Sequence, residues 1–395
     1  MKQKIAITAL SSVAALGHEP EQIWKRYLDD QSAITLETIG EQTVPVARIP
    51  LETRQQIEAL QQSHPQYRNL DPSVLFAIFA SRAAVRQAEW QEDEVFGINI
   101  GSSRGATQLF EQYHQEFLET GKSATLASPT TTLGNIATWV AQDLKSKGPE
   151  ISHSITCSTA LHALLNGIVW LESGRCNKFL VGGSEAPLTP FTMAQMQALK
   201  IYSKLRQAQC ESQSELVEDY FCRALDFEKQ KNTMVLGEGA SMACLELGTT
   251  PKALAYIEGI GYATEMLTHS LSISSEALCF QESMKGALQN TTPDTIDAIV
   301  MHAPGTLKGD MAEYKAIQHI FGENLPLLTT NKWKLGHTFG ASGMLSVELA
   351  VFMLRYNHFV PVPYIDSPKQ NRPLRKILVN AVGFGGNAVS VLLSV

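Results

Sequence analysis

Strand-like and helix-like patterns alternate along almost the whole chain, and this alternation restricts the possible folds more than any other feature of the sequence. Residues 95–103 form a short apolar run that ends in small residues, which is typical of a buried strand. Residues 73–90, which precede it, place apolar side chains at helical spacing. Repeated alternation of the two patterns favours a layered α/β fold.

The same alternation resumes after a short polar joint at residues 249–252. We therefore predict two halves, 1–248 and 249–395, with comparable sets of elements and a large shared interface. We interpret these halves as an ancient duplication. Within the first half, residues 234–247 predict a β-hairpin around a Gly-Glu-Gly connection.

Composition and charge exclude several classes of function. The chain has 395 residues, 44% hydrophobic and 18% charged, which is ordinary for a globular protein. Its net charge of −7 argues against nucleic-acid binding, and no apolar run reaches the roughly 18 residues needed for membrane insertion. Six cysteines without a C-x-x-C pair predict reduced thiols and a cytoplasmic location, with no metal site.

One cysteine lies where a strand-like segment changes into a helical one, in "ISHSITCSTALHALLNGIVWLESG" (residues 151–174). If a helix begins just after Cys157, the backbone N–H groups and the helix dipole would favour its thiolate. Free cysteine is also among the most buried residue types, so a packing role is the better explanation for Cys157 taken alone. A catalytic role requires partners elsewhere in the chain.

Two histidines follow strand-like segments and precede helices. His302 lies in "VMHAPGTLKGDMAEYKAI", and His337 lies in "TTNKWKLGHTFGASG" together with Lys332. Glycines beside both histidines allow other groups to approach closely. A third glycine cluster, 383–387, offers backbone N–H groups of the kind that an oxyanion hole requires.

These segments resemble the β-ketoacyl-acyl-carrier-protein synthases of the condensing-enzyme, thiolase-like superfamily. The resemblance rests on "TCSTALHAL", "HAPGTLKGDMAE", "NKWKLGHTFGASG", "GFGGN" and "VLGEGASM", in the family's order, and covers residues 3–395. It implies a five-layer α/β/α/β/α fold with two mixed five-stranded sheets around buried helices. The Cys157 helix should be one of those central helices.

The resemblance also implies a decarboxylative Claisen condensation. Cys157 would hold the acyl group as a thioester, and neutral His302 and His337 would stabilise the enolate formed from malonyl carrier protein. The backbone N–H groups of Cys157 and Phe384 would form the oxyanion hole, and Phe384 would also gate the acyl pocket. Lys332 would support the second histidine, through Asp310 or Glu313.

The family pattern assigns further contacts and partners. Substrate contacts implied by the resemblance are Thr306, Gly383, Gly385 and Asn387. Acidic carrier protein predicts a basic patch at the tunnel mouth, for which the candidates are Lys200, Lys204 and Arg206; a solvated helix face explains these residues equally. No cofactor is expected beyond the phosphopantetheine arm of the carrier. The family implies a dimer, with an identical or homologous partner packed on residues 127–142 and on the strand before Cys157.

Three departures from the family pattern indicate a divergent member. Pro304 occupies a position where the family usually has threonine, which removes one of two expected pantetheine hydroxyl contacts. Ser346 replaces the acidic residue nine positions after the second histidine. Asn232 and Thr233 stand in place of the usual Asp-Gly.

These departures favour a specialised fatty-acid, polyketide or aryl-polyene pathway over general fatty-acid synthesis. They also leave an alternative, a chain-length-factor-like subunit that pairs with an active synthase and does not condense. Such subunits generally lack the cysteine, which is present here as Cys157. Thiolase activity is disfavoured because no cysteine follows Cys279.

Overall fold

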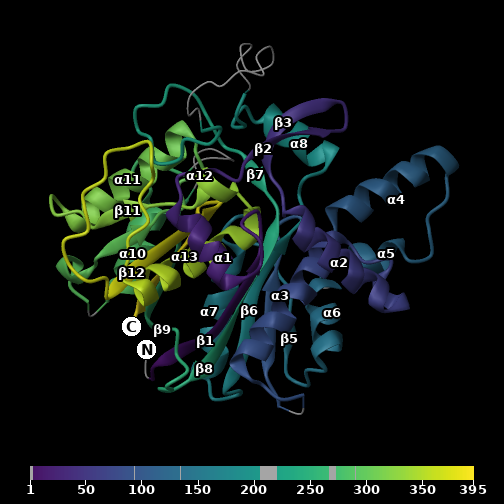
Figure 1. The fold of residues 1–395 in the computed structure, drawn as a ribbon, viewed down its shortest axis with the longest axis horizontal. Helices are drawn as coiled ribbons and strands as arrows, with labels where there is room; N and C mark the ends of the chain where they lie inside the picture. The colour runs from purple at the N-terminus through teal and green to yellow at the C-terminus, as the bar shows by residue number, and fades with distance from the viewer. Residues whose placement is uncertain (1–2, 93, 134, 205–219, 267–272, 290) are drawn as a thin grey trace.

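One ten-stranded sheet forms the centre of the molecule (Figure 1). The computed structural model describes residues 3–92, 94–133, 135–204, 220–266, 273–289 and 291–395. The first five strands in spatial order are β5 (Glu150–Ile151), β4 (Gly97–Gly101), β6 (Lys178–Glu185), β8 (Gly239–Leu247) and β1 (Ile5–Val13). The other five are β9 (Ala255–Thr264), β13 (Asn387–Ser394), β12 (Lys376–Gly383), β10 (Ala298–Val300) and β11 (Leu327–Thr329).

The two groups of five strands share one topology. β4 pairs parallel to β5 and β6, and β8 pairs antiparallel to β6 and β1. In the second group, β10 pairs parallel to β11 and β12, and β13 pairs antiparallel to β12 and β9. The same order and sense of strands in both groups is what a duplicated fold predicts.

Helices complete five layers. α7 (Thr159–Glu172) and α13 (Ser342–Tyr356) contact each other and strands of both groups, so they form the middle layer. α3 (Pro72–Ala88) and α6 (Asn135–Leu144) cover the outer face of the first group. α10 (Leu278–Leu288) and α11 (Leu307–Phe321) cover the second. The predicted five-layer thiolase-like architecture is confirmed.

One detail of the sheets differs from the prediction. The two five-stranded sheets are joined, because β1 and β9 pair antiparallel through Ile5–Ile7 and Ala255–Ile257. All six of these residues except Tyr256 are almost fully buried. The continuous sheet lets the apolar core run from one half into the other.

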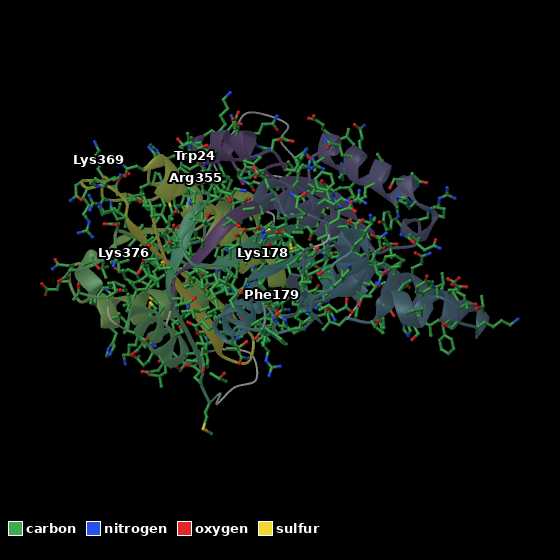
Figure 2. The ribbon with its side chains drawn as sticks, turned by 90° about the horizontal axis from the view of Figure 1, so that it is seen from below. Trp24, Lys178, Phe179, Arg355, Lys369 and Lys376 are labelled. Atoms are coloured by element: carbon green, nitrogen blue, oxygen red, sulfur yellow. The ribbon has the colours of Figure 1, made fainter. Side chains whose placement is uncertain are left out.

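The middle layer is apolar, as the sequence predicts for helices buried on several sides. Leu161, Leu164 and Ile168 of α7 are buried, and every residue of α13 from 342 to 354 is buried. Phe179 of β6 lies within the body of the molecule, whereas Lys369 lies at its edge (Figure 2). Burying apolar surface of this kind is the main favourable contribution to folding.

The remaining elements lie around this core. They are α1 (Pro20–Leu28), β2 (Thr35–Ile39), β3 (Gln42–Ala47), α2 (Leu51–Ser63), η1 (Pro65–Tyr67), α4 (Thr107–Thr120), α5 (Ala127–Thr131), α8 (Pro190–Ala198), β7 (Leu236–Gly237), η2 (Pro293–Thr295), α12 (Lys332–Leu335) and η3 (Phe339–Ala341). Figure 1 shows α4 extending away from the main body. In the described parts of the chain, no helix is long and apolar enough to cross a membrane.

The predicted hairpin over residues 234–247 is wrong. β7 pairs with β3 in a separate three-stranded sheet, whereas β8 pairs with β1 and β6 in the large one. Glu238 between them accepts the backbone N–H of Ile49, and Gly239 has φ +152°. The Gly-Glu-Gly segment therefore passes the chain between two sheets and does not reverse it.

Candidate active site

A cavity of about 760 Å³ brings together segments from both halves of the chain. Six of the predicted site residues line it: Cys157, Thr306, His302, His337, Gly383 and Phe384. Apolar side chains of α8 and the segment after it, including Met196, Leu199 and Ile201, line it as well. The cavity therefore combines reactive groups with a largely apolar wall.

Cys157 occupies a tight turn directly before α7. Thr156 adopts a left-handed conformation with φ 45°, and Ser158 occupies the N-cap position of the helix. The Thr159 hydroxyl accepts the backbone N–H of Ile155 at 2.8 Å and donates to the Thr156 carbonyl at 2.6 Å. These bonds fix the turn that presents the sulfur of Cys157 to the cavity.

A second turn meets the cysteine turn. The hydroxyl of Thr156 donates to the carbonyl of Phe384 at 3.4 Å. A Cβ atom at Gly383 would overlap the Thr156 hydroxyl, so only glycine allows this approach. The positive φ angles of Gly385 and Gly386 then let the chain turn into β13. The turn is thus held against the segment that carries Cys157.

Burial dominates the acidity of Cys157. The thiol is 6% exposed, and burial raises its pKa to about 12, with a further rise from the nearby charge of Glu185. The positive charges of Lys332 and Arg104 oppose this rise. The sequence predicted a lowered pKa from the helix terminus. At this buried position the cost of desolvating a thiolate is larger than the stabilisation that the helix terminus offers.

Two buried carboxylates of α11 shape the loop that holds His302. Glu313 accepts the backbone N–H groups of His302 and Ala303 at 3.0 and 2.9 Å. Asp310 accepts the N–H groups of Gly305 and Thr306 and forms a 2.8 Å ion pair with Lys229. Burial raises the pKa of Glu313 to about 7. These contacts fix the loop and hence the position of the imidazole.

His337 lies close to His302. Their ring centroids are 5.2 Å apart with the ring planes at 86°, and the Nδ1 atoms of both rings are buried without a hydrogen-bond partner. Burial lowers the pKa of His337 to about 3, with a smaller contribution from the charge of Lys332. The same causes, together with His337, hold the pKa of His302 well below its usual range. Both imidazoles are therefore neutral at physiological pH.

Lys332 is buried behind the histidines and does not line the cavity. Its ammonium group contacts the side-chain oxygens of Asn331 at 2.9 Å and Ser346 at 3.4 Å. The sequence analysis expected Lys332 to act through Asp310 or Glu313. Both carboxylates instead bind backbone N–H groups in the loop of residues 302–306. Burial lowers the pKa of Lys332 to about 8.

The other predicted positions lie outside the cavity lining. Asn387 begins β13, and its side-chain oxygen accepts the hydroxyl of Thr264 at 2.9 Å. Lys200 and Lys204 are exposed, and Lys200 lies between the lining residues Leu199 and Ile201. Arg206 lies outside the described residues.

Glu185 was missed by the sequence analysis. It ends β6, is fully buried, and accepts N–H groups from Ser103 and Gly340, so it ties the loop after β4 to η3, just beyond His337. Burial raises its pKa to about 7, and its second oxygen, Oε2, has no hydrogen-bond partner. An acidic residue that ends an apolar strand is the sequence signal that could have indicated it.

Comparison with protein families accounts for most of the chain. Residues 2–250 match the model of the β-ketoacyl synthase N-terminal domain, and residues 254–366 match that of the C-terminal domain. The chain belongs to the β-ketoacyl synthase family. The predicted family is therefore confirmed, and the synthase is an acyl-transferring ketosynthase.

The synthase is similar to curated relatives and to solved structures over its full length. A 3-oxoacyl-[acyl-carrier-protein] synthase 2 of Coxiella burnetii is 26% identical, covering 100% of this chain and 99% of the relative. The ishigamide ketosynthase/chain length factor structure has a TM-score of 0.85 at 18% identity, covering 100% and 99% of the two chains. A ketosynthase in complex with its chain length factor, from Xenorhabdus doucetiae, has a TM-score of 0.76 at 21% identity, covering 100% and 98%. The structural likenesses show the shared fold.

Proposed function

We propose that the synthase condenses an acyl group held on Cys157 with a malonyl group delivered by acyl carrier protein. The main support is that Cys157, His302 and His337 line the same cavity although they are far apart in the sequence. Ketosynthases belong to this family, and the Coxiella burnetii relative is named for acyl-carrier-protein substrates. The substrates would thus arrive on phosphopantetheine arms, and no other cofactor is proposed.

Acyl transfer to Cys157 comes first. The sulfur attacks the thioester carbonyl of the acyl carrier, the new sulfur–carbon bond forms, and the carrier sulfur leaves with the proton that the thiol gives up. The backbone N–H groups of Cys157 and Phe384 would stabilise the carbonyl oxygen, since both residues line the cavity on contacting turns. No net proton is exchanged with solvent in this half-reaction.

Condensation follows when malonyl carrier protein enters. Cleavage of the carbon–carbon bond to the carboxylate releases carbon dioxide and leaves an enolate, whose oxygen accepts hydrogen bonds from the neutral rings of His302 and His337. The enolate carbon attacks the acyl–Cys157 carbonyl, and Cys157 leaves as a thiolate that takes a proton from solvent. Neutral imidazoles suit this role because each can donate a ring N–H to the enolate oxygen. No external base is needed, since decarboxylation itself generates the enolate.

Intact-mass measurement after incubation with a panel of acyl carrier proteins tests the first step. We expect an acyl adduct on the wild-type chain that is absent in Cys157→Ala. Absence of an adduct with every carrier, combined with activity in a separate subunit, would favour the chain-length-factor alternative. The neutral contacts of Lys332 at Asn331 and Ser346, in place of a carboxylate, are the observation that keeps this alternative open.

We further propose a dimer with an identical or homologous partner. Phe110, Phe117 and Leu118 of α4 are 60%, 49% and 65% exposed, and α4 precedes the expected interface at residues 127–142. Exposed aromatic and aliphatic groups on one projecting helix are typical of an interaction surface. Sedimentation of the wild-type chain and of Phe117→Asp tests this: a shift of the variant toward monomer supports it, and a monomeric wild-type chain contradicts a homodimer.

The assignment to fatty-acid, polyketide or aryl-polyene biosynthesis in the cytoplasm remains part of this proposal. The five cysteines in the described residues are free, which fits a reducing compartment. The departures at Pro304 and Ser346 favour a specialised pathway. The acyl chain accepted in the intact-mass panel would distinguish these pathways.

A further inference from the structure

Lys332 carries a buried positive charge without a carboxylate directly beside it. It is 1% exposed, and its ammonium group contacts the neutral side chains of Asn331 and Ser346. In the described residues, no carboxylate forms an ion pair with it. An amide oxygen is a weaker partner for an ammonium group than a carboxylate is. The orientation of the Asn331 amide therefore matters more here than it would beside an ion pair.

The Asn331 amide presents its oxygen to Lys332. Oδ1 accepts a hydrogen bond from the ammonium group at 2.9 Å and contacts the hydroxyl of Ser346 at 3.4 Å. Nδ2 is buried and has no hydrogen-bond partner among the described residues. Buried amide N–H groups are normally bonded, and a rotated amide would place its N–H groups against the ammonium group. An acceptor for Nδ2 is needed to hold the amide in the orientation that Lys332 requires.

Tyr27 of α1 offers such an acceptor. Its side chain is buried, and its hydroxyl also has no hydrogen-bond partner in the described part of the chain. Burial raises the pKa of Tyr27 well above its usual value, the charge of Glu348 adds to this rise, and the Asn331 side chain opposes it. The phenol therefore lies close to both the amide and a carboxylate. A hydroxyl group can accept from the first and donate to the second.

Glu348 is a buried acid of α13 that does not line the cavity. It is 3% exposed, and its Oε2 accepts the hydroxyl of Ser12 in β1 at 2.9 Å. Glu348 follows Ser346 by two residues, so the two side chains leave the helix in different directions. Ser346 stands where the family usually has an acid. α13 thus retains a carboxylate near this position, but one that faces α1 and β1.

We propose that Glu348 positions the Asn331 amide through Tyr27, in place of a carboxylate beside Lys332. In this chain of hydrogen bonds, Nδ2 of Asn331 donates to the Tyr27 oxygen, and the Tyr27 hydroxyl donates to Glu348. Both unpartnered groups are then bonded, and Oδ1 of Asn331 stays against Lys332. Glu348 and Tyr27 are positioning residues, since neither lines the cavity. The consequence for catalysis rests on the proposed function.

The charge of Lys332 acts on the reacting groups around it. It opposes the rise in the pKa of Cys157 and lowers the pKa of both histidines. Burial lowers the pKa of Lys332 to about 8, against the opposing effects of Glu313, Cys222, Cys157 and Asp310. Loss of the Asn331 oxygen would remove a further contact that favours the charged form. Lys332 would then lose its proton at a lower pH.

Iodoacetamide alkylation of Cys157 reports the charge of Lys332 without any carrier substrate. Only the thiolate reacts, so the rate rises with pH until Lys332 loses its proton and the thiolate becomes harder to form. We expect this bend near pH 8 in the wild-type chain and about half a pH unit lower in Tyr27→Phe. Glu348→Gln should move the bend in the same direction by a smaller amount. Mass spectrometry of the Cys157 peptide measures the rate.

Asn331→Asp separates this role from a purely structural one. A carboxylate has an oxygen at each end, so its orientation does not depend on Tyr27. In the Asn331→Asp background, Tyr27→Phe should therefore leave the bend where it is. Tyr67→Phe is the matched control, because it removes another buried phenol, which donates to Asp143 far from Lys332 in the sequence. It should not move the bend.

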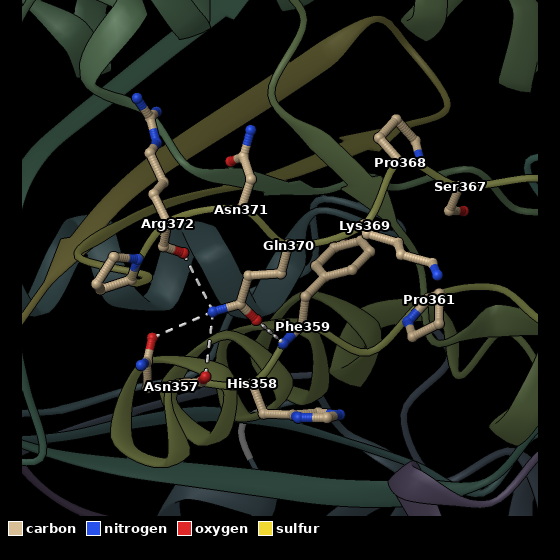
Figure 3. A pocket seen from close by; sticks show the side chains of 11 residues that line it. Asn357, His358, Phe359, Pro361, Ser367, Pro368, Lys369, Gln370, Asn371 and Arg372 are labelled. Carbon is tan, nitrogen blue, oxygen red and sulfur yellow. Dashed lines mark hydrogen bonds between the residues drawn. The ribbon is translucent and has the colours of Figure 1, made fainter.

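Gln370→Ala controls for movement of α13. The Gln370 amide accepts the N–H of Phe359 and donates to the carbonyl of Asn357, just beyond the C-terminal end of that helix (Figure 3). This variant should loosen the helix end and leave the bend unchanged. An unchanged bend in Tyr27→Phe, or an equal shift in both backgrounds, would overturn the inference. Failure of every carrier to acylate Cys157 would instead remove the proposed function and leave the alkylation profile measurable.

Discussion

At the residue scale, burial sets the protonation of the reacting groups. It holds Cys157 as a thiol and both imidazoles as neutral rings. Desolvation disfavours whichever form is charged, so it acts in opposite directions on an acid and a base. In the proposed mechanism, Cys157 therefore has to lose its proton during acyl transfer, and both neutral histidines can donate hydrogen bonds to the enolate.

The rate of malonyl decarboxylation should not fall between pH 8 and pH 5.5 through protonation of His302 or His337. Their folded pKa values lie below the unfolded value of about 6.5, with that of His337 near 3. Their contribution to stability is therefore complete above the unfolded pKa and is lost as pH falls toward the folded one. The ring NMR signals of His302 and His337 across this range are the measurement, because Glu313 and Glu185 also titrate near pH 7 and affect the rate. Protonation of either ring near pH 6.5 would contradict the prediction.

Asn331→Asp should move the alkaline limb of acyl transfer upward by about one pH unit or more. It places a carboxylate 2.9 Å from the Lys332 ammonium group with little change in volume, and an adjacent opposite charge raises a lysine pKa from its present value near 8. The rate of Cys157 acylation from pH 7 to 10 measures this. Ser346→Ala is the control and should show no upward shift, and an unchanged limb in Asn331→Asp would refute the prediction.

The sequence predicted the candidate site residues but not the side-chain contacts around them. Cys157 and the two histidines follow from local motifs, because each is embedded in small residues at a strand-to-helix turn. The partners of Lys332 and the role of Glu185 depend on contacts between segments far apart in the chain. The spacing within any one segment cannot predict such contacts.

At the element scale, close helix packing positions Cys157. α7 follows Cys157, and α13 follows the turn of His337 and η3. A Cβ atom at Gly343 would lie 2.7 Å from Cγ of Leu161, so these helices meet where one has no side chain. This contact links the two segments that carry Cys157 and His337.

Gly343→Ala should therefore lower the free energy of unfolding by about 1–3 kcal/mol, the usual cost of overpacking a core. Helix propensity alone would predict a gain of about 1 kcal/mol. Chemical denaturation measures the change. Combining it with Leu161→Ala should give strong non-additivity, because the smaller side chain relieves the overlap. Stabilisation by Gly343→Ala in the wild-type background would refute the packing argument.

Hydrophobic periodicity predicted most helices and strands. It failed where pairing between distant segments decides the structure. The apolar run at residues 95–103 corresponds to β4, and the helical spacing at residues 73–90 corresponds to α3. The strand-like residues before Cys157 form only Glu150–Ile151, since the chain must then turn toward the cavity. The false hairpin at 234–247 arose because glycines permit both a reversal and a crossing between sheets.

At the scale of the whole molecule, the candidate active site combines contributions from both groups of strands. Cys157 comes from the first group of elements, and the histidines and Phe384 come from the second. We propose that these groups correspond to the duplicated halves 1–248 and 249–395. Because the sheet is continuous and α7 contacts α13, neither half buries its apolar surface alone.

The two halves should therefore unfold together. Calorimetry of the full chain is expected to show one transition. Its calorimetric enthalpy should equal its van't Hoff enthalpy, as in two-state unfolding. Fluorescence and circular dichroism should follow the same midpoint. Two separate transitions would contradict this prediction and indicate that the halves are independently stable.

The convergence of one thiol and two imidazoles on a single cavity is tested most directly by separating the two half-reactions. Acyl transfer to Cys157 and release of carbon dioxide from malonyl carrier protein are measured for the wild-type chain, Cys157→Ala and His337→Ala. We expect Cys157→Ala to lose the acyl adduct and still release carbon dioxide, and His337→Ala to keep the adduct and lose most carbon dioxide release. Normal decarboxylation and condensation by His337→Ala would contradict the assignment of these residues to one site.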